Sequence, residues 1–308
     1  MQTSIGQIAA LGTSVCWTVT ALAFEYAAKK IGSLALNILR LTVAFGIFAG
    51  VGLVLHGQLI PLNAPGSVWF WLTLSGLVGF VFGDIFLFQS YIDIGARTAQ
   101  VIFVSSPLIT AILGFFLLGE RIAPLGIFGM VLVIASIITV ILYKNAITAA
   151  SGTGDMDPGI HRTHKIRGAI FALLGALGQS GGLILSKIGA PSYDPLGATQ
   201  IRVIAGLLGF IIVGALWKRL REPIAALSNR NALAALSLGA FFGPFLGVSL
   251  GLFAVQRSSS GIAATLMGLT PILILLPSVF IYKEKITPVE GLGALVAVLG
   301  AALIFYTP

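Results

Sequence analysis

Charged residues are scarce in this 308-residue chain: Asp, Glu, Lys and Arg make up 9% of it, whereas 57% of the residues are hydrophobic. A typical globular domain carries about 25% charged residues. So few charges cannot cover the surface of a water-soluble protein of this length. The scarcity excludes a soluble protein and predicts an integral membrane protein that is surrounded by lipid.

Cysteine and histidine are equally rare. Cys16 is the only cysteine, which excludes a disulfide framework and a cysteine-based metal site. The three histidines, His56, His161 and His164, are scattered in or beside expected loops and form no convincing metal site. The sequence holds no Walker-type phosphate-binding loop, so an ATP-driven pump is not indicated. We therefore expect no enzyme, no metal and no cofactor.

Long apolar stretches dominate what is present. A helix that crosses a bilayer needs about 20 mostly apolar residues. The sequence predicts an all-α polytopic membrane protein with ten transmembrane helices, over 5–27, 34–56, 67–90, 98–119, 124–143, 166–187, 196–217, 231–255, 260–281 and 288–306. The first stretch has no basic segment before it and is too long for a signal peptide, so we expect no cleavable signal.

The chain reads as two related halves. Residues 1–144 form the first expected five-helix repeat, 145–165 a polar linker, and 166–308 the second repeat. Residues 107–124 read PLITAILGFFLLGERIAP, and residues 271–288 read PILILLPSVFIYKEKITP. One constant offset relates Pro107 to Pro271, Glu120 to Glu284, Pro124 to Pro288, Gly79 to Gly243, and Gly83 to Gly247. Because five is odd, the second half enters the membrane from the opposite side, which makes an inverted repeat.

Basic residues predict the orientation. With the loops assigned alternately to two sides, one side collects Lys29, Lys30, Arg97, Lys144, Arg162, Lys165, Arg167, Lys218, Arg219, Arg221, Arg230, Lys283 and Lys285, and the other collects Arg121, Lys187 and Arg257. The first side is expected to be cytoplasmic. Both termini and the 57–66 loop then lie on the non-cytoplasmic side. The net charge of +8 forms no stripe, so we expect no nucleic-acid partner.

The duplicated five-helix layout and the two turn motifs resemble the EamA branch of the drug/metabolite transporter superfamily. The motifs are Pro107 followed by Gly119-Glu120-Arg121, and Pro271 followed by Lys283-Glu284-Lys285, where Lys283 replaces the usual Gly. The chain resembles in particular the exporters of amino acids, including the aromatic amino acid and methyl viologen exporter group. The resemblance implies a carrier of small organic molecules with a central cavity and without nucleotide hydrolysis.

Charges within the expected helices are candidates for function, because burying a charge in a membrane is costly. Arg40 and Asp84 both lie about six residues from the basic side, or roughly 9–10 Å deep at about 1.5 Å per residue. We expect them to pair, either as a gate or proton-coupling pair or as a structural salt bridge; alternatively, Arg40 extends to the interface. Arg202 is the counterpart of Arg40, but Val248 stands where a second Asp84 would be.

Polar and aromatic residues near mid-membrane are the expected cavity lining. Trp17 lies too deep for the interfacial aromatic belt, and Thr20 follows it by one turn. Gln179 and Ser180 fall at the equivalent depth in the second half. Each of these side chains could instead serve helix packing alone.

Two prolines mark expected breaks, because a membrane proline frees a carbonyl one turn earlier. Ser105 precedes Pro107, and Met267 precedes Pro271. We expect these prolines to be gating kinks, with packing kinks as the alternative. Tyr91 lies at the basic-side mouth, where it could contact a polar substrate.

These features predict a secondary transporter that exports amino acids or similar small metabolites across a bacterial cytoplasmic (inner) membrane by alternating access. We expect a monomer in the lipid bilayer with a small-molecule substrate. The alternatives are a carrier of drugs, organic cations, sugars or nucleotide sugars, and a non-transporting membrane protein.

Overall fold

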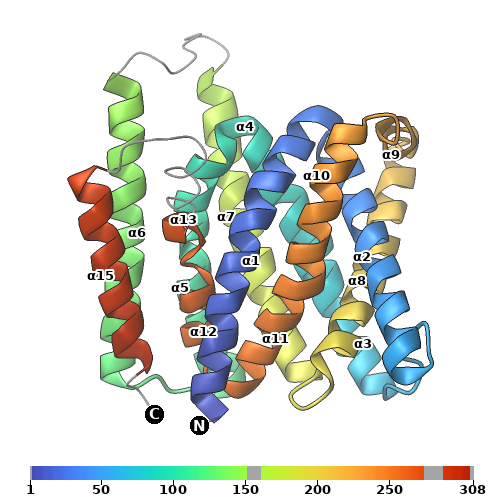
Figure 1. Ribbon diagram of the computed structural model, residues 1–308, viewed down its shortest axis with the longest axis horizontal. Coiled ribbons are helices and arrows are strands. Elements are labelled where there is room, and N and C mark those ends of the chain that lie inside the picture. Colours follow the sequence, from blue (N-terminus) through green and yellow to red (C-terminus); the bar gives the residue numbers. More distant parts are fainter. Residues whose placement is uncertain (1, 151–160, 274–286, 306–308) are drawn as a thin grey trace.

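The computed structural model describes residues 2–150, 161–273 and 287–305, and every regular element in these ranges is a helix (Figure 1). Among the described residues, six helical stretches are long and apolar enough to cross a membrane: Ser4–Ile31, Ser33–His56, Gly66–Ile94, Ile166–Gly189, Pro195–Leu216 and Arg230–Arg257. Three shorter apolar helices are Ser105–Leu118, Pro124–Val140 and Gly291–Leu303. The all-helical membrane fold is confirmed, and the number of ten spanning helices stays a prediction.

The helices of the first half are α1 (Gln2–Ile31), α2 (Ser33–His56), α3 (Gly66–Gly76), the π-helix η1 (Leu77–Gly83), α4 (Asp84–Phe103), α5 (Ser105–Leu118) and α6 (Pro124–Ala150). Those of the second half are α7 (His161–Gly189), α8 (Pro195–Leu216), α9 (Arg221–Ala226), α10 (Arg230–Ala240), the π-helix η2 (Phe241–Gly247), α11 (Val248–Arg257), α12 (Ser260–Met267), α13 (Thr270–Leu273) and α15 (Pro288–Phe305).

Helix ends follow local chemistry. Gly32, with φ of 80°, is the single residue between α1 and α2. Gly119 ends α5 in the left-handed conformation that favours glycine. At the start of α8 the Asp194 carboxylate accepts a hydrogen bond from the Gly197 N–H at 2.7 Å, and the Asn229 side chain caps α10 in the same way.

One expected connection is wrong. The sequence indicated a break between helices over 91–97, whereas α4 continues through this segment and ends at Phe103. The segment contains no proline, and its single glycine is tolerated inside a helix. The break falls at Val104 instead, where Pro107 occupies the first turn of α5, the part of a helix that tolerates proline.

The two halves repeat at the level of single helix boundaries. The elements α3, η1 and α4 begin at Gly66, Leu77 and Asp84. The elements α10, η2 and α11 begin 164 residues later, at Arg230, Phe241 and Val248. A π-helix is rare and is frequent at functional sites. Its recurrence at the same register supports the duplication independently of the matching sequence letters.

The arrangement places related helix pairs at the centre and the edge of the molecule. Helix α7 packs against α3, η1 and α4, and α1 packs against α10, η2 and α11. Helices α6 and α15 lie side by side at the left edge of Figure 1. Both termini lie at the lower end in Figure 1, and the ends of α6 and α7 that flank residues 151–160 lie at the upper end.

The backbones of the two halves touch where α7 of the second half crosses η1 of the first. A Cβ atom added to Gly178 would lie 2.5 Å from the Gly83 Cα atom, and one added to Gly182 would lie 2.7 Å from the Gly79 Cα atom. No side chain fits into such a crossing, which is the close approach that small residues allow in membranes.

At the equivalent crossing, of α1 in the first half with η2 in the second, side chains of α1 occupy the contact. A Cβ atom added to Gly243 would lie 2.7 Å from Thr20, and one added to Gly247 would lie 2.9 Å from the Trp17 ring. The α7–η1 pair is therefore packed backbone to backbone, whereas Trp17 and Thr20 fill the equivalent α1–η2 pair. This asymmetry leaves space beside α1.

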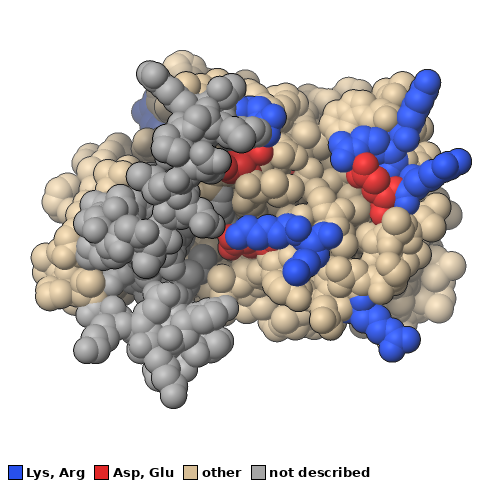
Figure 2. Space-filling view, turned by 90° about the horizontal axis from the view of Figure 1, so that it is seen from above, with Lys and Arg blue, Asp and Glu red and all other residues tan. Residues whose placement is uncertain are grey.

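The outer surface is apolar, as lipid requires. Val54, Leu62, Phe116 and Leu216 expose 75–83% of their surface. Figure 2 looks onto the upper end, where Lys and Arg side chains gather with acidic residues beside several of them. The Lys29–Glu25 pair is of this surface kind, with 2.8 Å between the charged atoms. Such exposed pairs add little to stability.

Candidate functional site

A cavity lies at the centre of the molecule, between the two halves. It offers about 140 Å³ to the centres of water-sized molecules, whereas one water needs roughly 10–15 Å³ on this measure. It is lined by residues of both repeats: Trp17, Thr20, Ala21, Phe24, Arg40, Phe80, Asp84, Leu87, Phe88, Tyr91, Phe103, Val104, Ser106, Pro107, Gln179, Leu183, Arg202, Gly243, Pro244, Val248, Gly251, Ala264, Met267, Gly268 and Thr270. The cavity is large enough for a small organic molecule.

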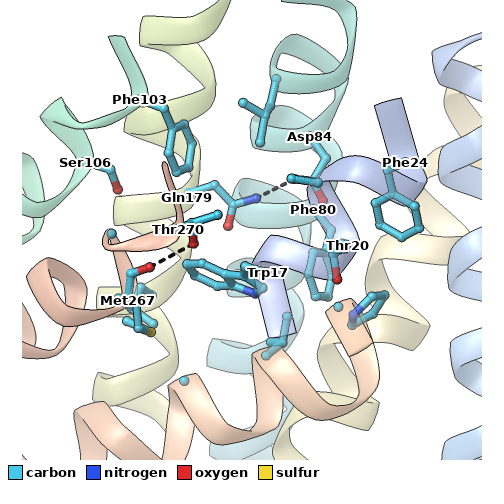
Figure 3. Close-up of a pocket in the computed structure, with 18 of the residues that line it drawn as sticks. Trp17, Thr20, Phe24, Phe80, Asp84, Phe103, Ser106, Gln179, Met267 and Thr270 are labelled. Carbon is cyan, nitrogen blue, oxygen red and sulfur yellow. Dashed lines mark hydrogen bonds between the residues drawn. The ribbon is translucent and has the colours of Figure 1, made fainter. Parts of the chain in front are cut away.

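Asp84 is the only acidic residue among the described residues that line the cavity. Its Oδ2 atom accepts a hydrogen bond from the Arg40 guanidinium. Its Oδ1 atom accepts one from the Gln179 amide, which Figure 3 shows as a dashed line. Asp84 lies at the start of α4, directly after η1. Both carboxylate oxygens are therefore engaged, one by each half of the chain.

Arg40 is held in a closed environment. Its Nε atom donates to the Asn37 side chain at 2.9 Å. Its guanidinium carbon lies 4.9 Å from the Phe88 ring centre and 5.5 Å from that of Phe24, and aromatic faces stabilise a cation at such distances. Arg40 is 3% exposed, so it does not extend to the interface.

Arg202 lines the same cavity from α8 but differs from Arg40 in its partners. It is 3% exposed, and its guanidinium lies over the Phe80 ring at 5.0 Å. Its Nε atom has no hydrogen-bond partner in the part of the chain that the structure describes. Asp84 acts on Arg202 electrostatically, but the two form no ion pair within the described residues.

Trp17 lies in the middle of the cavity view in Figure 3, with Met267, Thr270 and Gln179 around it. Its indole N–H makes no hydrogen bond to another described residue. The Thr20 hydroxyl, in contrast, donates to the Cys16 carbonyl at 2.9 Å. Trp17 lines the cavity with its Nε1 atom beside η2, where a Cβ atom at Gly247 would lie 2.9 Å from it, and Thr20 keeps its hydrogen bond within the protein.

Most of the predicted site residues share this cavity. Its lining includes Trp17, Thr20, Arg40, Asp84, Tyr91, Pro107, Gln179 and Met267. Their roles toward a substrate stay predictions.

Three predicted residues are placed differently. Ser180 is fully buried and bonds Ser106 at 2.9 Å, so it ties α7 to α5. Ser105 does not line the cavity, and its Oγ atom has no partner among the described residues. The backbone of Pro271 lies in α13, and its side chain is outside the described part.

The sequence interpretation assigned no site role to several lining residues. Arg202 carried a signal, namely a charge inside an apolar stretch that recurs from Arg40. Phe24, Phe80 and Phe103 carried none, because a phenylalanine that faces a cavity and one that faces lipid look alike in a sequence. The described residues contain no cluster of three His, Cys, Asp or Glu that could hold a metal.

A polar cluster joins the ends of α5, α7, α11 and α12 at the lower end of the molecule. The Lys187 ammonium lies 2.7 Å from the Glu120 carboxylate and donates to the Ser258 carbonyl at 2.7 Å. Glu120 also accepts from the Ser260 N–H at 2.7 Å and from its hydroxyl at 2.9 Å. Glu120 belongs to the first repeat, and the other three residues belong to the second. The cluster therefore fastens the repeats together at the end that holds the termini (Figure 1).

Two segments of the chain, residues 4–142 and 166–306, match one family, the EamA-like transporter family. The chain belongs to this family. The match takes in both repeats and leaves out the polar segment between them, and it makes the protein an integral, multi-pass membrane transporter of small molecules.

This EamA-like transporter also resembles a solved crystal structure over nearly its whole length. The two are 20% identical, the similarity covers 97% of this chain and 94% of the other, and the TM-score is 0.71. At this identity the similarity shows a shared fold and nothing further. No curated protein matches the chain.

Proposed function

We propose that this EamA-like transporter is a secondary transporter that exports amino acids or similar small metabolites through the central cavity by alternating access. The observation that carries the proposal is the cavity between the repeats, lined by residues of both and holding a polar centre at Asp84 and Gln179. Sites of this kind are typical of secondary transporters with internal repeats. The protein acts as a monomer without catalysis.

Alternating access requires one end to be closed while the other is open. The Glu120–Lys187–Ser260 cluster supplies a closure at the lower end, and it has to break for that end to open. It joins the two repeats, so a rocking of one repeat against the other would separate its members.

An organic cation is the weaker substrate candidate. A cation carrier needs an unpaired acid in its cavity, and the one acid in the described lining, Asp84, is already bonded to Arg40 and Gln179. A zwitterionic or anionic substrate needs no such acid.

Flux measurements test the proposal. Liposomes containing the purified protein are loaded with labelled amino acids and, separately, organic cations, with and without a pH gradient. We expect efflux of at least one amino acid above that of empty liposomes. No flux of any member would contradict the exporter proposal. Amino-acid flux that ignores the pH gradient and persists in Asp84→Asn would exclude a coupling role for Asp84.

We also propose ten transmembrane helices in two inverted repeats, in a bacterial cytoplasmic membrane with both termini outside. Cysteine labelling in a Cys16→Ala background tests the orientation. A membrane-impermeant reagent is expected to label Leu62→Cys in intact cells, because Leu62 is 78% exposed in the 57–66 loop. Ser228→Cys, between α9 and α10, is expected to react only after permeabilisation. The reverse pattern would overturn the orientation, and labelling of both from outside would overturn the topology.

A further inference from the structure

We propose that Arg202 binds a carboxylate of the transported substrate, so that this EamA-like transporter carries small monocarboxylates with an apolar body. The inference rests on the proposed export function and adds the chemical group by which the substrate is recognised.

The described cavity lining carries an uncompensated positive charge. Its charged members are Arg40, Asp84 and Arg202. The carboxylate of Asp84 neutralises Arg40, and Gln179 occupies its other oxygen. Arg202 is thereby left as the surplus cation. A buried charge without a partner is costly, so its counter-charge has to come from elsewhere.

The surroundings of Arg202 fit a binding role. Arg202 is 3% exposed, yet it lines the cavity, and its Nε atom has no hydrogen-bond partner among the described residues. Phe80 supports its guanidinium from one side at 5.0 Å. The neighbouring residue Gly79 has no side chain, and a Cβ atom there would lie only 3.3 Å from the Arg202 Nη2 atom. The guanidinium is held in place by packing while its donors remain unused.

A carboxylate is the anion that this arrangement favours. The planar guanidinium presents parallel N–H donors that match the two oxygens of a carboxylate. Trp17 lines the same cavity, and its indole N–H makes no hydrogen bond to another described residue. Both groups are donors, which suits an acceptor-only ligand group and disfavours an amine.

The rest of the lining selects an apolar body of limited charge. Phe24, Phe103, Leu183 and Met267 present hydrocarbon and sulfur surfaces to the cavity. A second negative charge on the ligand would meet Asp84 without a further cation to balance it. The cavity therefore fits one carboxylate joined to an apolar group, with or without an amino group.

Three isosteric probes separate the possibilities: leucine, isocaproate, which lacks the amino group, and isoamylamine, which lacks the carboxylate. Binding to the purified full-length protein and efflux from liposomes are measured for each. We expect leucine or isocaproate to bind and to move, and isoamylamine to do neither. In Arg202→Gln, affinity for the carboxylates is expected to fall roughly 10- to 100-fold, the value of a charge-assisted hydrogen bond.

The melting temperature separates a binding role for Arg202 from a purely structural one. If Arg202 binds substrate, removing this unpaired buried charge is expected to leave the melting temperature of the free protein unchanged or raised, whereas loss of a structural contact would lower it. The carboxylate probe is expected to raise the melting temperature of the wild type but not that of Arg202→Gln. The matched control is Arg219→Gln at the upper end, whose side chain is 51% exposed and pairs with Glu222; it is expected to bind as the wild type does.

The possible outcomes distinguish the role of Arg202, the carboxylate class of the substrate and the export function. Carboxylate flux and affinity that are equal in wild type and Arg202→Gln would overturn the role of Arg202 and leave the export function standing. Flux of isoamylamine alone would overturn the carboxylate class while a carrier remains. No flux of any of the three, or of the amino acids in the wider panel, would overturn the export function and this inference with it.

Discussion

Replacing Asp84 by Ala is expected to destabilise the protein by about 3–5 kcal/mol, the usual cost of removing one member of a buried ion pair. The substitution leaves the Arg40 guanidinium 3% exposed with only the Asn37 side chain as a hydrogen-bond partner among the described residues. It also removes one of the two acceptors of the Gln179 amide and leaves two unbalanced cations, Arg40 and Arg202, in one cavity. Thermal unfolding of the purified protein in detergent measures the effect.

A paired variant shows whether the lost charge balance is the cause. In Arg40→Met combined with Asp84→Leu both charges are removed, and most of the stability is expected to return, because apolar replacements of a buried pair are often neutral or stabilising. Glu25→Ala is the matched control, since the Glu25–Lys29 pair is exposed and is worth about 0–1 kcal/mol. An Asp84→Ala protein that melts with the wild type, or a double variant no more stable than Asp84→Ala, would contradict the electrostatic explanation.

The fold was predictable to the extent that the membrane dictates it. Apolar length alone located α1, α2, α7 and α8 to within a few residues. The repeat offset predicted from Pro107 and Pro271 is the offset that separates η1 from η2. The continuation of α4 through 91–97 was not predictable in this way, because the composition of that segment permits both a loop and a helix. The π-helices were also missed, since no residue pattern distinguishes them.

The candidate site was predictable in its polar members. A charge, an indole or an amide inside an apolar stretch is exceptional, and this is why the sequence alone indicates Arg40, Asp84, Trp17 and Gln179. Hydroxyl groups were less informative. A serine satisfies itself by bonding a nearby carbonyl, so Ser180 could serve the α7–α5 contact as easily as the cavity. Which face of each helix meets the cavity depends on packing, which the sequence does not encode with a clear period.

The repeated scaffold became one particular carrier at the positions where its halves differ. Gly178 and Gly83 close the α7–η1 crossing, whereas Trp17 fills the equivalent crossing of α1 with η2. Asp84 follows the first π-helix, and Val248 follows the second. The repeat therefore explains the arrangement of the helices, and the residues that differ between the repeats explain why the polar groups of the cavity are not repeated.

Filling the cavity from the position of Val248 is expected to abolish transport while the fold is kept. Val248 lines the cavity and is the counterpart of Asp84 in the second repeat. A tryptophan there would occupy part of the cavity and leave Arg40, Asp84 and Arg202 in place. The matched control is Val54→Trp on α2, because Val54 is 83% exposed on the outer surface.

Substrate counterflow in liposomes, with the substrate that the flux panel identifies, tests the central claim that transport passes through the cavity between the repeats. Wild type and Val54→Trp are expected to exchange the labelled substrate at equal rates, and Val248→Trp is expected to exchange it no faster than empty liposomes. A Val248→Trp protein that elutes and melts as the wild type does and still exchanges substrate at the wild-type rate would contradict the claim.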